Sequence, residues 1–178
     1  MHSLRQKLSQ LNQLVASPKF WLKQLRDLSL LLLLLFGVGT YLQRDMATGS
    51  APALQGSTIN GGMLDIKEVK QPTLVYFWGS WCPVCRVTSP MVETVNQSYP
   101  VISVAIASGT DPEINQYMSD AQYHFPVIND TTGEISERWG ALALPAIYIV
   151  DANGEIRFVT SGATTTLGMK LRLALAGL

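Results

Sequence analysis

The sequence has few of the residues that hold metals and no cluster of the charges that bind nucleic acids. Its 178 residues include only two cysteines and two histidines. A structural zinc site needs about four protein ligands, and beyond the cysteines only His2 and His124 are good candidates. Basic and acidic side chains are balanced at 13 each, and no concentrated basic face is present for a nucleic acid. We therefore predict neither a metal site nor a nucleic-acid partner.

Both cysteines lie in one short motif, Trp81-Cys82-Pro83-Val84-Cys85, directly after the apolar run 73–78. Two thiols separated by two residues, where a strand becomes a helix, indicate a redox-active pair. If Pro83 opens the helix, Cys82 lies at its N-terminus, where unpaired N–H groups and the helix dipole favour a thiolate. Cys82 is therefore the expected nucleophile. Cys85 lies one turn further on the same face and is the expected resolving thiol.

Other uses of the motif fit less well. Haem attachment requires a histidine directly after the second cysteine, and Arg86 stands there. A structural disulfide would close too short a loop to remove much chain entropy from the unfolded state. A passive binding domain with incidental cysteines is a further alternative. A dithiol carries two electrons by itself, so we expect no cofactor beyond a redox-active Cys82–Cys85 disulfide.

A long uncharged segment precedes the motif. Residues 28–42 carry no charge and include six consecutive leucines, Leu30 to Leu35. A helix over this run would rise only about 22 Å, less than a hydrocarbon core of about 30 Å, but Arg26 and Arg44 can reach the interfaces from its ends. The segment therefore predicts a single membrane span. A cleaved signal peptide, with Ala51-Pro52-Ala53 as the cleavage site, is the alternative.

The charges on either side of this span predict its orientation. Only Asp27 opposes the basic residues that precede the span, which are Arg5, Lys7, Lys19, Lys23 and Arg26. The tail therefore has a net charge of +4 and the remainder of the chain −4, which places the N-terminus in the cytoplasm and the cysteines outside it. Disulfides form and persist in such extracytoplasmic spaces. The tail has apolar residues at helical spacing, which are Leu4, Leu8, Leu11, Leu14 and Val15. This spacing suits a helix on the cytoplasmic membrane surface, and a disordered tail is the alternative.

Composition divides the chain into four parts, and strands alternate with helices in the last. The parts are a cytoplasmic basic tail (1–27), a transmembrane anchor (28–43), a linker (44–57) and a folded domain (58–178). Strands are expected at 73–78, 101–107, 125–128, 146–150 and 156–160, with helices at 84–98, 111–121, 131–139 and after Thr164. Hairpin turns are expected at Asn60-Gly61-Gly62 and Asp151-Ala152-Asn153-Gly154. This order predicts an α/β three-layer sandwich with a mixed central sheet.

Two local signals predict details of the helices. Asp111-Pro112-Glu113 indicates a helix start capped by Asp111. Apolar residues at helical spacing give the last helix one apolar face, formed by Leu167, Leu171, Ala174, Leu175 and Leu178.

The run from Phe77 to Cys85, with Pro90 and with Leu144-Pro145-Ala146 before a late strand, resembles the thioredoxin superfamily over residues 58–178. The helix and strand between Asp111 and Ile128 are similar to the insertion of the TlpA/ResA/DsbE-like membrane-anchored thiol-disulfide oxidoreductases. Within that group the chain resembles the suppressor-of-copper-sensitivity D proteins. The resemblance implies a thioredoxin fold with a TlpA-like insertion after one N-terminal transmembrane helix. It also implies a bacterial inner-membrane location, with the C-terminal domain in the periplasm.

The resemblance further implies roles around the cysteines. It implies that the Leu144–Pro145 bond is cis and faces the pair, although most bonds before proline are trans. The backbone of Ala143 and Leu144 would bind an extended segment of a thiol or disulfide protein substrate, and Trp81 would form a wall of the site.

Pro83 and Val84, between the cysteines, bear on the direction of electron flow. Pro83 resembles the more oxidising members of the family, whereas Val84 offers no cation or donor to a thiolate. We expect an intermediate potential. Service as a reductase or isomerase, fed by a DsbD-type membrane electron donor, is favoured over primary oxidation.

Two departures from related proteins qualify these roles. Tyr76 stands where thioredoxins carry a buried acid, so proton transfer at Cys85 needs another group or water. Ala143-Leu144-Pro145-Ala146 differs from the Gly-Ala-Pro-Glu typical of cytochrome c maturation reductases, which weakens cytochrome c maturation as an alternative function.

A copper chaperone on the same fold is a further alternative because thiolates select Cu(I). Copper-delivery relatives, however, have three residues between their cysteines and a histidine later than His124.

Overall fold

The computed structural model describes residues 18–178 and divides the chain into two compact units, Met1–Tyr41 and Leu42–Leu178. Most of the predicted basic tail, with its apolar residues at helical spacing and His2, lies outside the described residues.

The described part of the first unit is helical. Helix α2 (Pro18–Gln43) is longer than the predicted anchor, and its stretch Phe20–Gln43 is apolar enough to cross a membrane. The leucine side chains of this stretch are exposed. The Thr40 hydroxyl donates to the Phe36 and Gly37 carbonyls at 3.0 Å, so this polar group is hydrogen-bonded within the helix and needs no water as a partner. An apolar helix near the N-terminus is consistent with a membrane anchor, and signal sequences share this composition.

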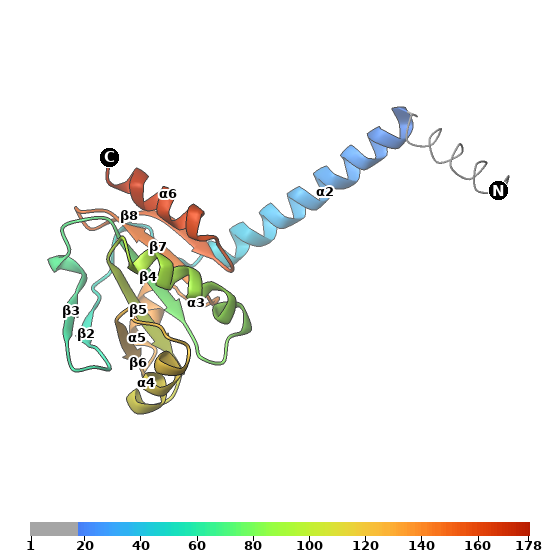
Figure 1. The fold of residues 1–178 in the computed structure, drawn as a ribbon. Helices are drawn as coiled ribbons and strands as arrows, with labels where there is room; N and C mark the ends of the chain where they lie inside the picture. Colours follow the sequence, from blue (N-terminus) through green and yellow to red (C-terminus); the bar gives the residue numbers. More distant parts are fainter. Residues whose placement is uncertain (1–17) are drawn as a thin grey trace. The chain divides into compact units, whose positions relative to one another are not determined.

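The second unit is built on a six-stranded mixed sheet with the order β1-β8-β7-β4-β5-β6 (Figure 1). Central strand β4 runs parallel to β5 and antiparallel to β7, and β5 runs parallel to β6. The prediction of a mixed sheet is confirmed. The strands are β1 (Gly49–Ser50), β4 (Thr73–Trp78), β5 (Val101–Ile106), β6 (Val127–Asp130), β7 (Ala146–Val150) and β8 (Glu155–Ser161).

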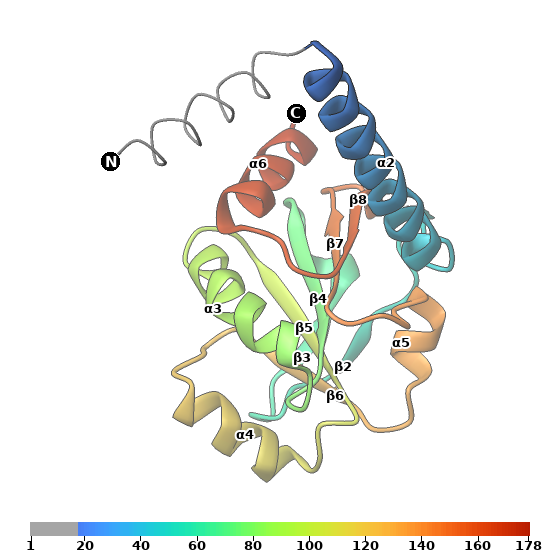
Figure 2. The same ribbon diagram turned by 90° about the vertical axis from the view of Figure 1, so that its right-hand side faces the viewer.

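Helices cover both faces of this sheet, which makes the three predicted layers (Figure 2). The helices are α3 (Pro83–Asn96), α4 (Asp111–Asp120), α5 (Glu134–Trp139) and α6 (Thr166–Ala176), with a short 3-10 helix η1 (Ile66–Glu68). Strand β4 is buried on both faces because its side chains alternate. Leu74, Tyr76 and Trp78 join the core under α3, α4 and α6, whereas Val75 and Phe77 join the core under α5. The cysteine motif follows this rigid strand.

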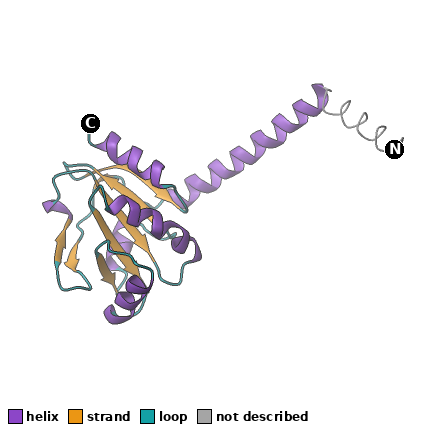
Figure 3. Cartoon of the chain, viewed as in Figure 1, coloured by secondary structure: helices purple, strands orange, loops and turns teal. Residues whose placement is uncertain are grey.

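The expected linker, residues 44–57, is part of the folded domain, which corrects the prediction. Met46 and Leu54 are buried in the core under α5, and the Ala47 N–H donates to the Trp139 carbonyl at 2.9 Å. Strand β1 pairs with β8. Strand β2 (Gln55–Ser57) forms a separate antiparallel hairpin with β3 (Met63–Asp65), seen beside the large sheet in Figure 3. The segment shows no periodicity because its two core residues are separated by small residues.

Helix α4 is capped one residue earlier than predicted. Thr110 is the N-cap, and its backbone N–H and hydroxyl both donate to the Glu113 carboxylate, at 2.7 and 2.9 Å. The Glu113 side chain therefore caps the start of the helix, and Asp111 is the first helical residue.

The predicted apolar face of helix α6 is not its buried face. Met169 and Leu173 are buried against the sheet and α3, whereas Leu167, Leu171 and Leu175 are exposed. Thr165 caps the helix by accepting from the Gly168 N–H, and the helix packs through the residues between the leucines. The leucine spacing indicated a helix correctly but not which side faces the core.

Candidate active site

The loop between β4 and α3 is held by hydrogen bonds that four residues donate. The Cys82 N–H donates to the Gly79 carbonyl at 3.1 Å, and the Ser80 N–H donates to the Ser108 hydroxyl at 3.0 Å.

Two side chains also hold the loop. The Trp81 indole, about half exposed, donates to the Ile106 carbonyl at 3.2 Å. A Cβ at Gly79 would lie 2.8 Å from that indole, so glycine is what permits this close packing. The Arg86 guanidinium donates back to the Ser80 carbonyl at 3.3 Å.

Cys82 and Cys85 form a disulfide at the start of α3. Cys82 is the N-cap and Pro83 is the first helical residue. The Cys82 sulfur accepts a hydrogen bond from the Cys85 N–H at 3.2 Å. Cys85 is wholly buried and Cys82 keeps 4% of its surface. An incoming thiolate must reach a sulfur along an open path, so Cys82 is the more reachable of the two.

The loop before β7 lies against this disulfide. The Leu144–Pro145 peptide bond is cis, and the Leu144 carbonyl oxygen lies 3.9 Å from the Cys82 sulfur. The Pro145 carbonyl accepts from the Gly162 N–H at 2.8 Å, and the Ala143 carbonyl accepts from the Ser161 hydroxyl at 3.5 Å. These two hydrogen bonds, donated at the end of strand β8, hold the loop beside the Cys82 sulfur.

The two segments that carry the disulfide and the cis peptide expose four large apolar side chains. Trp81, Val84 and Val87 stand on the loop and first turns of α3, and Leu142 stands on the loop before β7. Apolar side chains that gather on a surface mark a site of contact with other molecules. We call these four residues the apolar rim.

A pair of hydroxyl groups lies beneath Cys85. The Tyr76 and Ser89 hydroxyl oxygens are 2.9 Å apart, and the Tyr76 hydroxyl donates to the Cys85 carbonyl at 3.4 Å. All three residues are fully buried, and burial raises the pKa of the Tyr76 hydroxyl far above its usual value. In the described part of the chain, no carboxylate is a hydrogen-bond partner of either hydroxyl.

Sequence reasoning missed Ser89 as the partner of Tyr76. Ser89 lies four residues after Cys85, which places both residues on one face of α3. The spacing of Cys85 and Ser89 was a signal that the two residues share a face. Only the fold shows that Tyr76 of strand β4 lies against that face.

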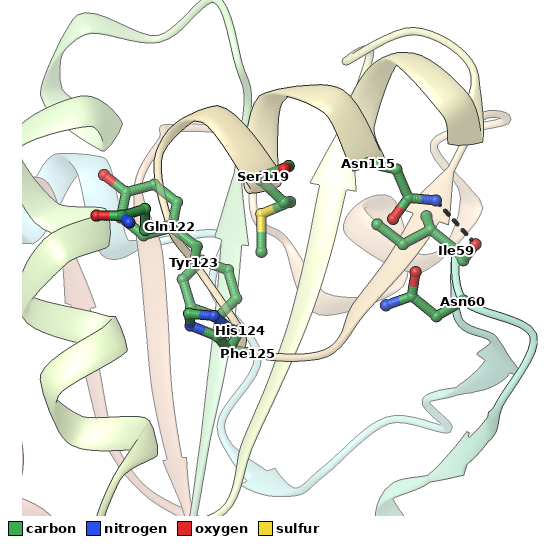
Figure 4. A pocket seen from close by; sticks show the side chains of 9 residues that line it. Ile59, Asn60, Asn115, Ser119, Gln122, Tyr123, His124 and Phe125 are labelled. Atoms are coloured by element: carbon green, nitrogen blue, oxygen red, sulfur yellow. Dashed lines mark hydrogen bonds between the residues drawn. The ribbon is translucent and has the colours of Figure 1, made fainter.

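His124 lies at a different place from the cysteines. It lines a cavity of about 400 Å³ between the C-terminal part of α4 and the loop before β3, with Ile59, Asn60, Asn115 and Tyr123 (Figure 4). The His124 ring Nδ1 lies 3.2 Å from a Glu93 carboxylate oxygen, and the same carboxylate accepts hydrogen bonds from the backbone N–H groups of His124 and Phe125. Neither cysteine lines this cavity.

Glu93 stands eight residues beyond Cys85 on α3, about 12 Å along the helix axis. Within residues 18–178 no three His, Cys, Asp or Glu side chains gather where they could hold a metal ion. The fold therefore does not bring His124 to the thiols, as a copper site with both would require.

Comparisons with known proteins agree with this geometry. The model of the AhpC/TSA family matches residues 48–159. The chain is 41% identical over 124 residues to a thioredoxin-like protein of Haemophilus influenzae, covering 69% of this chain and 72% of that protein. It is 27% identical over 120 residues to sporulation thiol-disulfide oxidoreductase A of Bacillus subtilis, covering 64% and 73%. The crystal structure of StoA from Bacillus subtilis matches with a TM-score of 0.62 at 22% identity, covering 68% and 96%.

Proposed function

Because the chain belongs to the AhpC/TSA family and is a thiol-disulfide oxidoreductase, we propose that it is a membrane-anchored reductase of protein disulfides in the periplasm of a bacterium. The observation that carries the proposal is the Cys82–Cys85 disulfide at a helix N-terminus, beside a cis-proline loop and an apolar rim. This arrangement provides a sulfur that can be attacked and a surface on which a partner can lie.

In the proposed reaction the reduced Cys82 thiolate attacks a disulfide of the partner. A Cys82–partner disulfide forms, the partner's own bond breaks, and one partner thiolate leaves and takes up a proton. Cys85 then loses its proton and attacks the Cys82 sulfur, which forms the Cys82–Cys85 disulfide and releases the second partner thiol. The partner gains two electrons and the chain loses two. A DsbD-type membrane dithiol donor would return them by the same exchange in reverse.

The neighbours of the cysteines support these roles. The Cys85 N–H already donates to the Cys82 sulfur, and the dipole of α3 adds to this stabilisation of a thiolate. Pro83 supplies the fixed backbone angle of a first helical residue, and Val84 and Trp81 present apolar surface to the partner. Backbone groups of Ala143 and Leu144 would pair with an extended partner segment, with Pro145 in the cis form keeping a backbone donor away from the sulfurs.

The direction of transfer follows from how weakly the thiolate is stabilised. In the described residues the Cys82 sulfur accepts one backbone hydrogen bond, and Arg86 donates to the Ser80 carbonyl. A strong oxidant needs a more stable thiolate, so an intermediate potential is expected. Equilibration of the full chain with a dithiol buffer measures it. A potential as oxidising as about −120 mV, that of a strong oxidant, would contradict the reductase assignment.

Trapping of mixed disulfides tests the function itself. In the full chain, Cys85→Ala should hold partners on Cys82 as covalent complexes that a reductant releases, because the resolving thiol is missing. The matched control is Cys82→Ala, which retains a single buried thiol and should trap almost nothing. If both variants trap nothing, the cysteines do not exchange with proteins.

A further inference from the structure

The backbone of Ser80, two residues before Cys82, is held on both sides. Its N–H donates to the Ser108 hydroxyl at 3.0 Å, and its carbonyl accepts from the Nε and Nη2 atoms of Arg86 at 3.4 and 3.3 Å. These two backbone groups belong to the two peptide planes that meet at the Ser80 Cα. Because peptide groups are planar, holding both planes fixes the backbone dihedral angles of Ser80. We call Ser80, Ser108 and Arg86 the Ser80 clamp.

The end of strand β5 brings Ser108 to this loop. Strand β4 runs parallel to β5, so both strands end at the same edge of the sheet. Ala107, directly after β5, has a left-handed φ of 46°. A residue with a Cβ is disfavoured there, and such strain persists where surrounding contacts determine it, often at active sites. With this turn, the Ser108 hydroxyl donates to the Ile106 carbonyl at 3.0 Å while it accepts from Ser80.

The clamp fixes the direction in which the chain enters α3. The Cys82 N–H and the Gly79 carbonyl close a tight turn, and Ser80 is the second residue of that turn. Cys82 follows as the N-cap, with the extended angles φ −82° and ψ 114° that suit this position. In this geometry its sulfur accepts from the Cys85 N–H. That hydrogen bond and the helix dipole favour a thiolate, so a rotation at Ser80 that moves Cys82 out of the cap weakens the nucleophile.

Charged groups around the disulfide are few. Arg86 is the one charged side chain in the segments that meet there, 79–88, 106–109 and 141–146. In the described part of the chain its guanidinium donates to the Ser80 carbonyl and to neither sulfur. Tyr76, beneath Cys85, stays neutral because burial raises its pKa. The geometry of the N-cap is therefore the main property through which these surroundings act on Cys82.

We propose that Ser108 and Arg86 are positioning residues for thiol exchange, which hold Cys82 through Ser80 in the N-cap geometry that stabilises its thiolate. Both act on the sulfur only through the backbone. The inference rests on exchange at Cys82, which the proposed function shares, and not on the direction of electron flow.

The pH profile of Cys82 alkylation tests the proposal in the reduced full chain in detergent micelles. Iodoacetamide reacts with the thiolate, and tandem mass spectrometry distinguishes Cys82 from Cys85. Ser108→Ala leaves the Ser80 N–H without its acceptor. On the acidic side of the wild-type midpoint we expect the rate to fall at least about 2-fold, without a fall of the plateau at high pH, because less of the thiol is ionised. Ser108→Thr keeps a hydroxyl and should restore the wild-type profile.

Ser103→Ala is the matched control. The Ser103 hydroxyl, on the same strand as Ile106, also accepts from an N–H and donates to a carbonyl. Its partners are the Trp78 indole at 3.2 Å and the Pro126 carbonyl at 2.8 Å, and neither belongs to the loop 79–82. Ser103→Ala should lower the urea midpoint of unfolding and leave the alkylation profile unchanged.

A double variant tests whether both side chains act through Ser80. Arg86→Met removes the second hold together with a charge, so the profiles are compared in about 1 M salt, where the charge is screened. Once either hold is lost Ser80 can rotate, so Ser108→Ala/Arg86→Met should shift the midpoint by less than the sum of the single shifts. Arg86 is exposed, so Arg86→Met carries the test if Ser108→Ala does not fold.

The opposite results overturn the proposal. These are an unchanged profile in Ser108→Ala and Arg86→Met, an equal shift in Ser103→Ala, a Ser108→Thr variant that behaves as Ser108→Ala, and additive shifts in the double variant. Trapping by Cys85→Ala reports on the proposed function separately. If trapping fails while Ser108→Ala shifts the profile, exchange with proteins fails and the positioning stands. If trapping succeeds and the profile does not shift, only this inference fails.

Discussion

Tyr76 replaces the buried acid of thioredoxins with a neutral hydroxyl group. Its contact with Ser89 at 2.9 Å and with the Cys85 carbonyl at 3.4 Å positions the second cysteine. Because burial raises the Tyr76 pKa, the hydroxyl stays protonated at neutral pH and cannot act as a base. The Cys85 proton must then pass to another group or to water in the resolving step.

The variant Tyr76→Phe tests this distinction. It should lose about 1–2 kcal/mol of unfolding free energy, since the buried hydroxyl's hydrogen bonds with Ser89 and the Cys85 carbonyl both disappear, and keep the pH profile of mixed-disulfide resolution. Tyr148→Phe is the matched control, because Tyr148 is an equally buried tyrosine whose hydroxyl donates to the Trp139 carbonyl on the other face of the sheet. A shift of the profile in Tyr76→Phe alone would make the hydroxyl a participant in proton transfer.

The same tyrosines predict how stability depends on alkaline pH. Burial raises the pKa of Tyr76 and of Tyr148 above the value of about 10 that tyrosine has in an unfolded chain. The folded state thus holds these protons more tightly, so the stabilisation is complete below pH ~10 and is lost as the pH rises through the folded-state values. Urea midpoints from pH 8 to 11 should fall above pH ~10, and less steeply in Tyr76→Phe/Tyr148→Phe. Equal slopes would contradict the raised pKa values.

At the scale of elements, the end of α5 depends on the segment that joins the domain to α2. Gly140 ends α5 with a left-handed φ of 65°. A Cβ there would overlap the Asp45 carbonyl, so this glycine allows the incoming chain to pass close to the helix end. The contact turns residues 44–57 from a tether into a part of the fold.

Gly140→Ala and Gly154→Ala separate that contact from backbone strain. Gly154 also has a positive φ, 84°, but a Cβ there would meet nothing within 4 Å. Gly154→Ala should cost about 1–2 kcal/mol through its left-handed backbone alone. Gly140→Ala should lower the free energy of unfolding by at least about 1 kcal/mol more than Gly154→Ala does, because the Asp45 backbone must also move. Urea unfolding of both variants measures the difference, and equal losses would show that segment 44–57 is not held at the helix end.

At the scale of the whole molecule, anchoring and electron supply belong together in the proposed function. The steady-state redox form of Cys82–Cys85 in cells reports both. We expect the reduced form to dominate when a DsbD-type donor is present and the disulfide to accumulate when it is removed, because disulfides persist in an oxidising compartment. Acid quenching followed by alkylation with a mass-tagged maleimide measures the two forms.

Deletion of residues 1–43 with export by a cleavable signal is the matched comparison. The released domain should oxidise more than the anchored chain, because its encounter with a membrane donor is then no longer confined to the membrane. A pair that is oxidised in both donor backgrounds would identify the chain as an oxidant.

The fold was predictable where local signals were contiguous in the chain. The buried run Thr73–Trp78 followed by Cys82 and Pro83 combines a strand, a cap and a first helical residue, and these three signals agree with the structure. The hairpin turns at 60–62 and 151–154 likewise join antiparallel strands. The mixed three-layer sandwich follows from the order of such elements.

The errors arose where distant contacts decide. Met46 and Leu54 look isolated in a small-residue segment, yet α5 and the sheet offer them a core. The spacing of the α6 leucines predicts one apolar face but not which side packs, and the side that packs carries Met169 and Leu173. Periodicity predicts that a helix has an apolar side, but the partner of that side is a property of the whole structure.

The sequence by itself determined the chemistry of this protein, since the only two thiols stand at a strand–helix junction whose capping geometry is local. The tertiary structure decided what surrounds them. It brings the Leu144 carbonyl to Cys82 from 62 residues away, sets Tyr76 and Ser89 beneath Cys85, keeps His124 beside Glu93, and leaves Leu167, Leu171 and Leu175 of α6 exposed. Each of these depends on how separate elements pack, and that is encoded by many residues together.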